Sequence, residues 1–252
     1  MLELLRLRKR HGSQAIPDIV KAELMETHRG FPEINESRFS GNLDELTAIC
    51  PTGAIGTRPL SIDMGKCIFC GECEIQSAGA IRFTNRHKTA STRRDDLVVP
   101  SGLAYEEFGA KAIEAAGGIR KILGRSLKLR QVSAGGCNGC EMELNACSNV
   151  NFDMGRFGID FVASPRHADG IVITGPITGN MAPALSDAYK SVSDPKIVVA
   201  VGACAISGGV FAESKHLNRT FVGEVQVDLF VPGCPPHPLT FINAILDFLK
   251  RR

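Results

Sequence analysis

The chain lacks several features that would place it in a common class of protein. No apolar run among its 252 residues approaches the ~18 residues of a membrane span. Its formal net charge of +2 is too small to indicate nucleic-acid binding. The segment after Met1 alternates leucine with basic residues and lacks the apolar core of a secretory signal, so we expect a cytoplasmic location. No Ser/His/Asp arrangement or supported carboxylate pair is visible, and we expect no catalytic residue.

Nine cysteines stand out against these absences. In a chain expected in the cytoplasm, cysteines grouped in close pairs indicate metal binding rather than disulfides. All but one fall into two sets of four. The remaining one, Cys147, follows Cys140 by seven residues, on the same face of a predicted helix. Because both sets are complete without it, we interpret Cys147 as a small buried apolar residue.

Apolar strand patterns alternate with helical patterns in the second half of the chain. Such alternation predicts an α/β domain at 125–252 with a doubly wound parallel sheet. Strands are predicted at 127–132, 159–162, 171–174, 197–201 and 227–231, and helices at 140–149, 182–192 and 238–250.

One set of cysteines follows three of these strands on predicted loops. The carboxyl ends of parallel strands share one edge of a sheet, so four thiolates there would converge. Four convergent thiolates suit a [4Fe-4S] cluster or a structural zinc ion, but their wide spread along the chain is unlike common zinc ribbons. The predicted ligands are Cys137, Cys140, Cys204 and Cys234.

The other set lies within residues 38–90. Cys67, Cys70 and Cys73 have the Cys-x-x-Cys-x-x-Cys spacing of a bacterial ferredoxin, and Cys50, followed by proline, supplies the fourth ligand. We therefore predict a small α+β ferredoxin-like domain that holds a [4Fe-4S] cluster. Zinc is again the alternative, which the Cys-Pro partner disfavours.

A second cluster of the usual ferredoxin kind has no ligands in this domain. Its expected positions fall on residues other than cysteine: Ser40, Leu43, Leu46, and Gln76 or Ser77. The half of the domain that lacks a cluster instead has Leu43, Leu46 and Ile49 at helical spacing. We therefore expect apolar packing to fill the space of the missing cluster.

The strand-end cysteines, together with 164–169 (Ser-Pro-Arg-His-Ala-Asp) and 232–236 (Pro-Gly-Cys-Pro-Pro), resemble the 20 kDa subunit family shared by group 4 [NiFe] hydrogenases and complex I. The resemblance implies a flavodoxin-like fold and a cluster that passes electrons to or from a partner large subunit. In a hydrogenase that subunit would hold the [NiFe] centre. The complex I branch has adjacent first cysteines, whereas Asn138-Gly139 separates Cys137 from Cys140 here, as in the hydrogenase branch.

We therefore expect a hydrogenase electron-transfer subunit. The alternatives are the equivalent subunit of a complex I-like quinone reductase or of a nickel-free hydrogenase relative, and a zinc-stabilised scaffold without electron transfer. Further iron–sulfur and membrane subunits are expected partners. Through them, the chain would lie peripherally on the inner face of the cell membrane.

The first cysteine domain resembles the ferredoxin-like iron–sulfur subunit of formate hydrogenlyase and complex I. The matching residues are 29–33 (Arg-Gly-Phe-Pro-Glu) and 65–71 (Gly-Lys-Cys-Ile-Phe-Cys-Gly). The whole chain is then expected to be a fusion. It would comprise an N-terminal arm at 1–37, the ferredoxin-like domain at 38–90, a linker and helix at 91–124 and the flavodoxin-like domain at 125–252.

Three further residues are weaker candidates beside the strand-end set. Glu141 directly follows Cys140, so it is a candidate proton relay at the large-subunit interface, or else an exposed or helix N-terminal carboxylate that favours the helix dipole. Arg166 and His167 match the family's Pro-Arg-His-Ala-Asp stretch. They are candidates for raising a cluster's potential, or else interface residues. Residues 105–123 predict a helix, and the basic first dozen residues predict a short amphipathic one.

Overall fold

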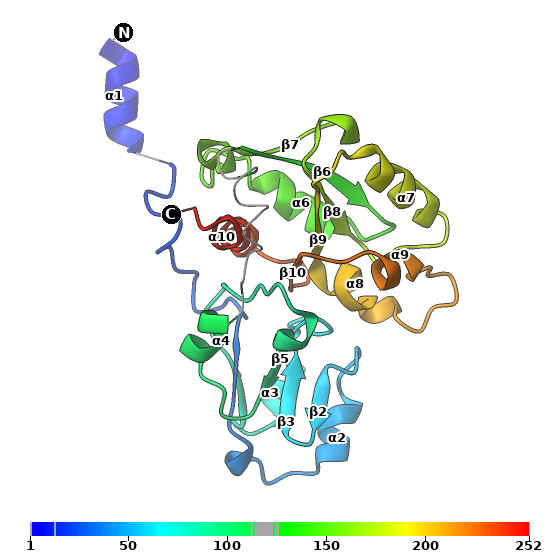
Figure 1. Ribbon diagram of the computed structural model, residues 1–252. Helices are drawn as coiled ribbons and strands as arrows, with labels where there is room; N and C mark the ends of the chain where they lie inside the picture. Colours follow the sequence, from blue (N-terminus) through cyan, green and yellow to red (C-terminus); the bar gives the residue numbers. More distant parts are fainter. Residues whose placement is uncertain (1, 13, 112, 114–122, 124–125, 252) are drawn as a thin grey trace.

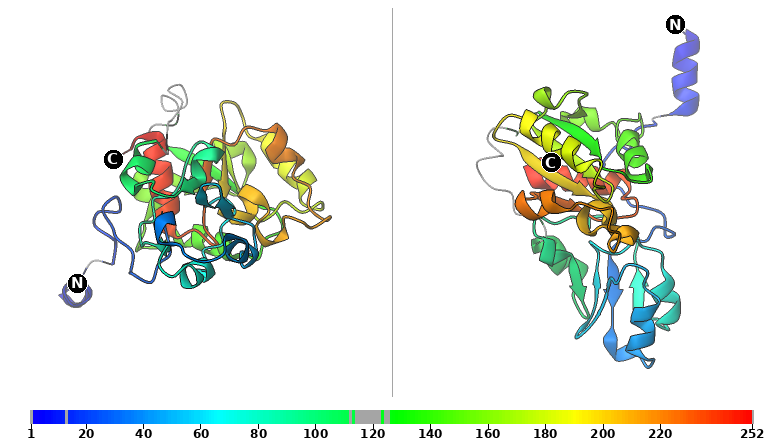
Figure 2. Two further views of the ribbon diagram at one scale, coloured as in Figure 1. Left: turned by 90° about the horizontal axis from the view of Figure 1, so that it is seen from below. Right: turned by 90° about the vertical axis from the view of Figure 1, so that its right-hand side faces the viewer.

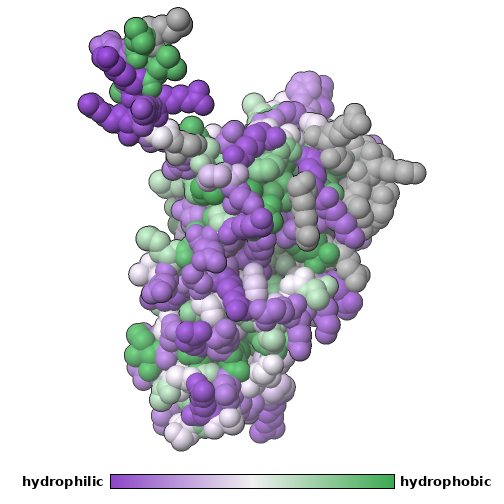
Figure 3. All heavy atoms as spheres, turned by 90° about the vertical axis from the view of Figure 1, so that its left-hand side faces the viewer, coloured by the Kyte–Doolittle hydropathy of each residue, from purple (hydrophilic) through white to green (hydrophobic). Residues whose placement is uncertain are grey.

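The computed structural model describes residues 2–12, 14–111, 113, 123 and 126–251. They form a larger lobe from the second half of the chain and a smaller lobe from most of the first half (Figure 1). Helix α1 (Leu2–His11) projects away from both, with all of its side chains exposed (Figure 3). No helix in the described part of the chain is both long and apolar enough to cross a membrane.

Five parallel strands form the sheet of the larger lobe, in the order β10-β9-β8-β6-β7. This is the flavodoxin-like order, in which the direction of winding switches between the first and third strands along the chain, here β6 and β8. The structure thus confirms the predicted doubly wound α/β fold. The strands are β6 (Leu127–Ser133), β7 (Ile159–Phe161), β8 (Gly170–Thr174), β9 (Ile197–Val201) and β10 (Leu229–Val231).

Alternate side chains of the central strands enter two separate cores, one on each face of the sheet. Helices α10 and α7 cover opposite faces of the sheet (Figure 2). Val172 and Val199 belong to the core on the α10 face, whereas Ile171 and Ile173 belong to the core on the α7 face. The second core continues into the smaller lobe. The helices are α6 (Gly139–Ala146), α7 (Ala182–Ser191), α8 (Gly202–Ser207), α9 (Thr220–Glu224) and α10 (Pro238–Leu249).

Two small antiparallel sheets form the smaller lobe. In one, β1 (Pro32–Ile34) pairs with β4 (Ile81–Phe83); in the other, β3 (Leu60–Asp63) lies between β2 (Ile55–Thr57) and β5 (Val98–Pro100). Leu46 is buried, and Leu43 and Ile49 pack on the same core, as the apolar pattern predicts. The helices are α2 (Leu43–Ala48), α3 (Glu72–Gln76) and α4 (Tyr105–Lys111).

The predicted boundaries at 37 and 90 are wrong because they cut through these sheets. Strand β1 lies in the predicted arm, while β5 and the 3-10 turn η2 (Arg94–Leu97) lie in the predicted linker. Ser91, also in that linker, exchanges two backbone hydrogen bonds with Phe230 of β10 (3.0 and 2.8 Å). Three-residue strands are too short to give a clear alternation in sequence. The predicted helix at 105–123 is confirmed as far as Lys111, and most of its remainder lies outside the described residues.

Candidate functional site

Four predicted ligands of the smaller lobe line one cavity. Cys50 comes from the turn after α2, and the other three, Cys67, Cys70 and Cys73, come from the loop and first turn that lead into α3. Apolar side chains, among them Ile55, complete its wall. The structure therefore brings together four thiols that are up to 23 residues apart in sequence, Cys50 and Cys73 being the extremes.

Backbone groups already point at these sulfurs. The amide of Ala54 donates to Cys50 Sγ (3.2 Å), and the amide of Phe69 donates to Cys67 Sγ (3.3 Å). The loop reaches this geometry through left-handed backbone at Phe69 (φ 56°) and Gly71 (φ 83°). Amide donors to sulfur stabilise thiolates and tune the potential of a cluster that thiolates bind.

Burial favours the neutral form of two of these thiols, Cys67 and Cys73, in the absence of a cation. It raises the pKa of Cys67 to about 12 and that of Cys73 to about 11, and repulsion from the neighbouring cysteines acts in the same direction. The thiolates of Cys67 and Cys73 that iron requires would thus form only as metal binds and releases their protons.

The second set lies where the sheet ends. Cys137 follows β6, Cys140 lies in the first turn of α6, and Cys234 follows β10. Cys204 lies in the first turn of α8, which starts directly after β9, so the prediction that it lies on a loop is wrong. Burial raises the pKa of Cys140 to about 12 and that of Cys204 to about 11. Repulsion from Glu141 adds to the shift of Cys140, and repulsion from Cys137 and Cys234 adds to the shifts of both Cys140 and Cys204.

Two glycines permit the backbone to approach these thiols. A Cβ atom on Gly202 (φ +88°) would lie 2.6 Å from Cys140 Sγ, and one on Gly209 (φ +57°) would lie 2.9 Å from Cys204 Sγ. Both positions have a left-handed backbone, which residues other than glycine rarely adopt. The glycines around the strand-end cysteines thus serve close approach to sulfur as well as turning the chain.

Glu141 is buried rather than exposed, with 6% of its surface accessible. One of its carboxylate oxygens, Oε1, accepts hydrogen bonds from Ser133 Oγ at the end of β6 and from Thr174 Oγ1 at the end of β8, both at 2.6 Å. The alternative of an exposed carboxylate is therefore wrong, whereas the alternative of a helix N-terminal carboxylate agrees with the place of Glu141 in the first turn of α6. The side chain ties the start of α6, next to Cys140, to both strands at the switch point. A proton-relay role stays a prediction.

Arg219 is a residue that the sequence reasoning missed. Its guanidinium donates to four backbone carbonyls, and its charge acts on Cys204, where it opposes the rise of the thiol's pKa. Among the described interactions of Arg166 and His167, none joins them to the four thiols. His167 N–H donates within its own turn, to Ser164 O (3.1 Å). The tuning role of those two residues therefore stays a prediction without a supporting contact.

Cys147 is fully buried in the core under α10, which confirms its interpretation as a small apolar residue. Its thiol faces Glu143 O and Pro238 O.

Sequence spacing also gave no sign that histidines from distant segments meet. The rings of His28 and His237 lie 6.0 Å apart, and burial lowers the pKa of both His87 and His237 to about 4.

The four thiols of the smaller lobe have the donor chemistry of either a [4Fe-4S] cluster or a zinc ion. Tetrahedral zinc holds four sulfurs about 2.3 Å from one point. Within the described residues, no group of three or more Cys, His, Asp or Glu side chains is arranged so that it could hold a metal ion. The thiols of the smaller lobe instead surround a cavity with apolar walls, and amides point at two of the sulfurs.

Comparison with known proteins places the larger lobe in a family. The family model described as NADH ubiquinone oxidoreductase, 20 Kd subunit, matches residues 137–248. The chain is 41% identical to the probable membrane-bound hydrogenase subunit mbhJ of Pyrococcus furiosus over 131 residues, which are 52% of this chain and 78% of that protein.

Two further relatives come from different complexes. Formate hydrogenlyase subunit 7 of Escherichia coli is 44% identical over 145 residues, which are 58% of this chain and 56% of that protein. The B subunit of the NADH-quinone oxidoreductase of Bacteroides fragilis is 42% identical over 113 residues, which are 44% of this chain and 58% of that protein.

These relatives define the class as subunits of oxidoreductases, either hydrogenases or quinone oxidoreductases. The chain belongs to the 20 kDa subunit family of NADH ubiquinone oxidoreductase. The cysteines Cys137, Cys140, Cys204 and Cys234 all lie within the matched residues.

Proposed function

We propose that the chain is the electron-transfer subunit of a membrane-associated group 4 [NiFe] hydrogenase. The observation that carries this proposal is the strand-end cysteine set within the family's domain, with Cys137 and Cys140 separated by two residues. The identity to a membrane-bound hydrogenase subunit and to a formate hydrogenlyase subunit supports it.

The chain's own residues would hold two [4Fe-4S] clusters. A bound cluster accepts and releases one electron at a potential that its surroundings set. In the smaller lobe, Cys50, Cys67, Cys70 and Cys73 would supply the thiolates, of which Cys67 and Cys73 are buried from water. In the larger lobe, the strand-end cysteines would supply the thiolates. The hydrogen bonds that Glu141 accepts would keep Cys140 at the edge of the sheet.

The two sites adjoin one space. A cavity of about 200 Å³ is lined by Ile68 and Phe69, which lie between two cysteines of the smaller lobe, and by Cys234 and Pro235 of the larger lobe. This proximity supports electron exchange within the chain, because no partner subunit has to lie between the sites. The ferredoxin-like nature of the smaller lobe is part of the same proposal.

A large subunit would bind at the exposed side of the strand-end site. Cys137 and Cys234 are exposed there, and Met142 of α6 exposes 65% of its surface. Exposed apolar side chains at a functional edge suit a protein interface. The bond chemistry would then take place on the partner's [NiFe] centre, and other iron–sulfur and membrane subunits would attach the complex to the inner face of the membrane.

The second candidate is the equivalent subunit of a complex I-like quinone reductase or of a nickel-free relative. The identity to a subunit of an NADH-quinone oxidoreductase favours it. The spacing of Cys137 and Cys140 disfavours the quinone reductase, since the resemblance implies adjacent cysteines in that branch. That spacing does not bear on the nickel-free relative.

The metal content of the intact complex separates these candidates. The complex would be purified anaerobically through a tag on this chain, its large subunit identified by mass spectrometry, and its nickel and iron measured. The hydrogenase proposal expects nickel in equal amount to this chain, with hydrogen-dependent dye reduction. Iron without nickel would reject the hydrogenase and favour the second candidate.

A further inference from the structure

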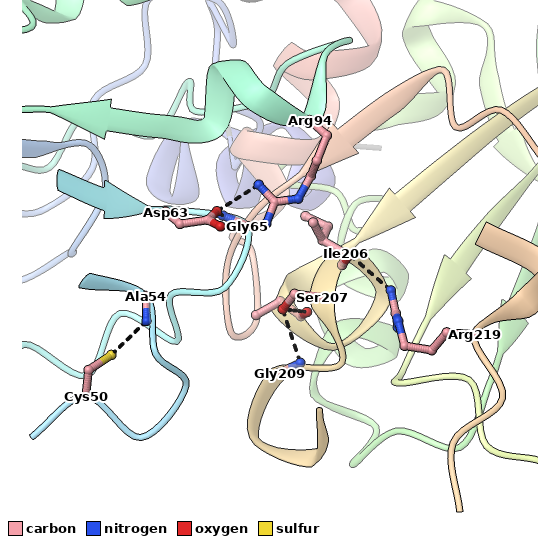
Figure 4. A network of polar contacts seen from close by, with 10 residues as sticks. Cys50, Ala54, Asp63, Gly65, Arg94, Ile206, Ser207, Gly209 and Arg219 are labelled. Atoms are coloured by element: carbon pink, nitrogen blue, oxygen red, sulfur yellow. Dashed lines mark hydrogen bonds and ion pairs between the residues drawn. The ribbon is translucent and has the colours of Figure 1, made fainter. Parts of the chain in front are cut away.

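Helix α8 touches both cysteine sites. It carries Cys204 in its first turn, and its Ile206 packs on the turn that precedes Cys67 of the smaller lobe. A Cβ atom on Gly65 in that turn would lie 2.9 Å from Ile206 Cγ2, so the glycine lets the helix approach closely. Figure 4 shows this contact between the lobes.

The turn that receives Ile206 is itself fixed by an ion pair. Asp63 accepts two hydrogen bonds from the guanidinium of Arg94 (2.8 and 2.7 Å) and one from the amide of Gly65 (2.9 Å). The carbonyl of Asp63 also accepts from the amide of Cys67 (2.9 Å). A displacement of α8 would therefore be transmitted to Cys67, first through the contact of Ile206 with this turn and then through the hydrogen bond from Cys67 to Asp63.

On its other side, α8 is held by Arg219. The guanidinium donates to the carbonyls of Cys204 (3.1 Å), Ala205 (2.9 Å) and Ile206 (3.0 Å), and to Pro176 O (3.2 Å) after β8. Cys204 O also accepts from the amide of Gly208 (2.8 Å), whereas Ala205 O and Ile206 O are among the last carbonyls of a six-residue helix, where intrahelical partners are lacking. Arg219 thus joins the helix to the sheet with one planar group.

Arg219 and its neighbour Arg94 differ in the groups that surround their positive charges. Asp63 neutralises Arg94, whereas all four hydrogen bonds of Arg219 go to uncharged carbonyls. Arg219 is half-buried, and burial lowers its pKa, while the charge of Cys204 acts in the opposite direction. A cation next to a cluster ligand favours the more negative, reduced state of a cluster.

We propose that Arg219 is a positioning residue that fixes α8 as the joint between the two cysteine sites, and that its charge raises the reduction potential of a cluster on Cys137, Cys140, Cys204 and Cys234. This inference rests on the proposed function. It assigns to Arg219 the tuning role that the sequence pattern suggested for Arg166 and His167.

The test is a redox titration of the anaerobically purified full chain, followed by electron paramagnetic resonance, in wild type, Arg219→Gln and Arg219→Lys. At a fixed solution potential, the reduced-to-oxidised ratio of the strand-end cluster should fall about tenfold in Arg219→Gln, the effect of a unit charge within ~12 Å at an effective dielectric constant of ~20. Arg219→Lys keeps the charge and should stay within about twofold of wild type.

The same spectra also test whether Arg219 fixes the position of α8. Arg219→Lys lacks the planar set of donors, so the magnetic interaction between the two reduced clusters should weaken or become heterogeneous. Arg156→Gln is the matched control, because Arg156 also donates to a backbone carbonyl, that of Ile16 (2.7 Å), but on an exposed part of the chain. It should change neither the ratio nor the interaction.

An unchanged ratio in Arg219→Gln would overturn the charge argument, and an unchanged interaction in Arg219→Lys would overturn the positioning role. If Arg219→Gln does not retain the cluster, Arg219→Lys decides: a ratio like that of wild type supports the inference, and a ratio lowered about tenfold refutes it. Failure of the wild type to show two cluster signals would instead reject the proposed function.

Discussion

Replacement of Glu141 by alanine should destabilise the larger lobe and the strand-end site together. The carboxylate is buried and accepts hydrogen bonds from Ser133 and Thr174, both at 2.6 Å. A hydrogen bond to a charged group contributes about 1.5 to 3 kcal/mol, and its loss leaves two buried hydroxyls without their acceptor. We expect the free energy of unfolding to fall by about 3 to 5 kcal/mol.

Glutamine at the same position provides the sharper comparison. Its amide oxygen can still accept from both hydroxyls, so Glu141→Gln should cost only about 1 kcal/mol, the difference between charged and neutral acceptors. Glu141→Ala should also lose iron from the strand-end site, whereas Glu141→Gln should retain it. Glu143→Ala is the control on the same helix, since Glu143 is only half-buried.

The assay is urea unfolding followed by circular dichroism, with iron measured on the same samples. Equal destabilisation by alanine and glutamine would contradict the anchoring account, because it would mean that the negative charge itself is required. If Glu141→Gln is stable and retains its iron but the complex loses turnover, the anchor and the predicted proton relay would both be supported.

Three further predictions follow from individual positions. Gly202→Ala would bring a Cβ atom to 2.6 Å from Cys140 Sγ and should remove about half of the bound iron, the strand-end share of two clusters, while Gly223→Ala, with open space around it, should keep all of it. Leu46→Ala should lower the free energy of unfolding by about 2 to 5 kcal/mol in urea titrations, because Leu46 is 3% exposed; a change below about 1 kcal/mol would contradict its place in the core. Burial lowers the pKa of His87 to about 4, below its unfolded value near 6.5, so the unfolded chain binds the proton more readily and stability should be lost as pH falls from 6.5 towards 4, by about 1.4 kcal/mol per pH unit for one proton. His87→Gln should reduce this slope in urea titrations at pH 7 and pH 5 without abolishing it, because burial also lowers the pKa of His237 to about 4, and an unchanged slope would refute the role of His87.

The sequence was most informative where one periodicity runs long enough to be recognised. Strand β9 was predicted with its exact bounds at 197–201, because five consecutive apolar residues follow proline and lysine. The cysteine pattern likewise predicted two sets of ligands, and the structure gathers the smaller-lobe set around one cavity. Helix α8 was missed because its six residues are too few to show a helical period.

Contacts between distant segments were not available from the sequence. Nothing local to Arg219 shows that it faces carbonyls of α8, since the residues that it meets lie 13 to 43 positions away. The same holds for Ser133 and Thr174 around Glu141, and for Ser91 beside β10. Such partners depend on the packing of the sheet, which a pattern of apolar residues predicts only in outline.

The most direct test of the account is the iron and acid-labile sulfide content of the anaerobically purified full chain, in wild type, Cys73→Ser and Cys204→Ser. Two [4Fe-4S] clusters require about eight iron and about eight sulfide per chain, with absorption that bleaches on dithionite, and each variant should lose about half. A colourless wild-type chain with about one zinc per cysteine set and no labile sulfide would contradict the account at its centre.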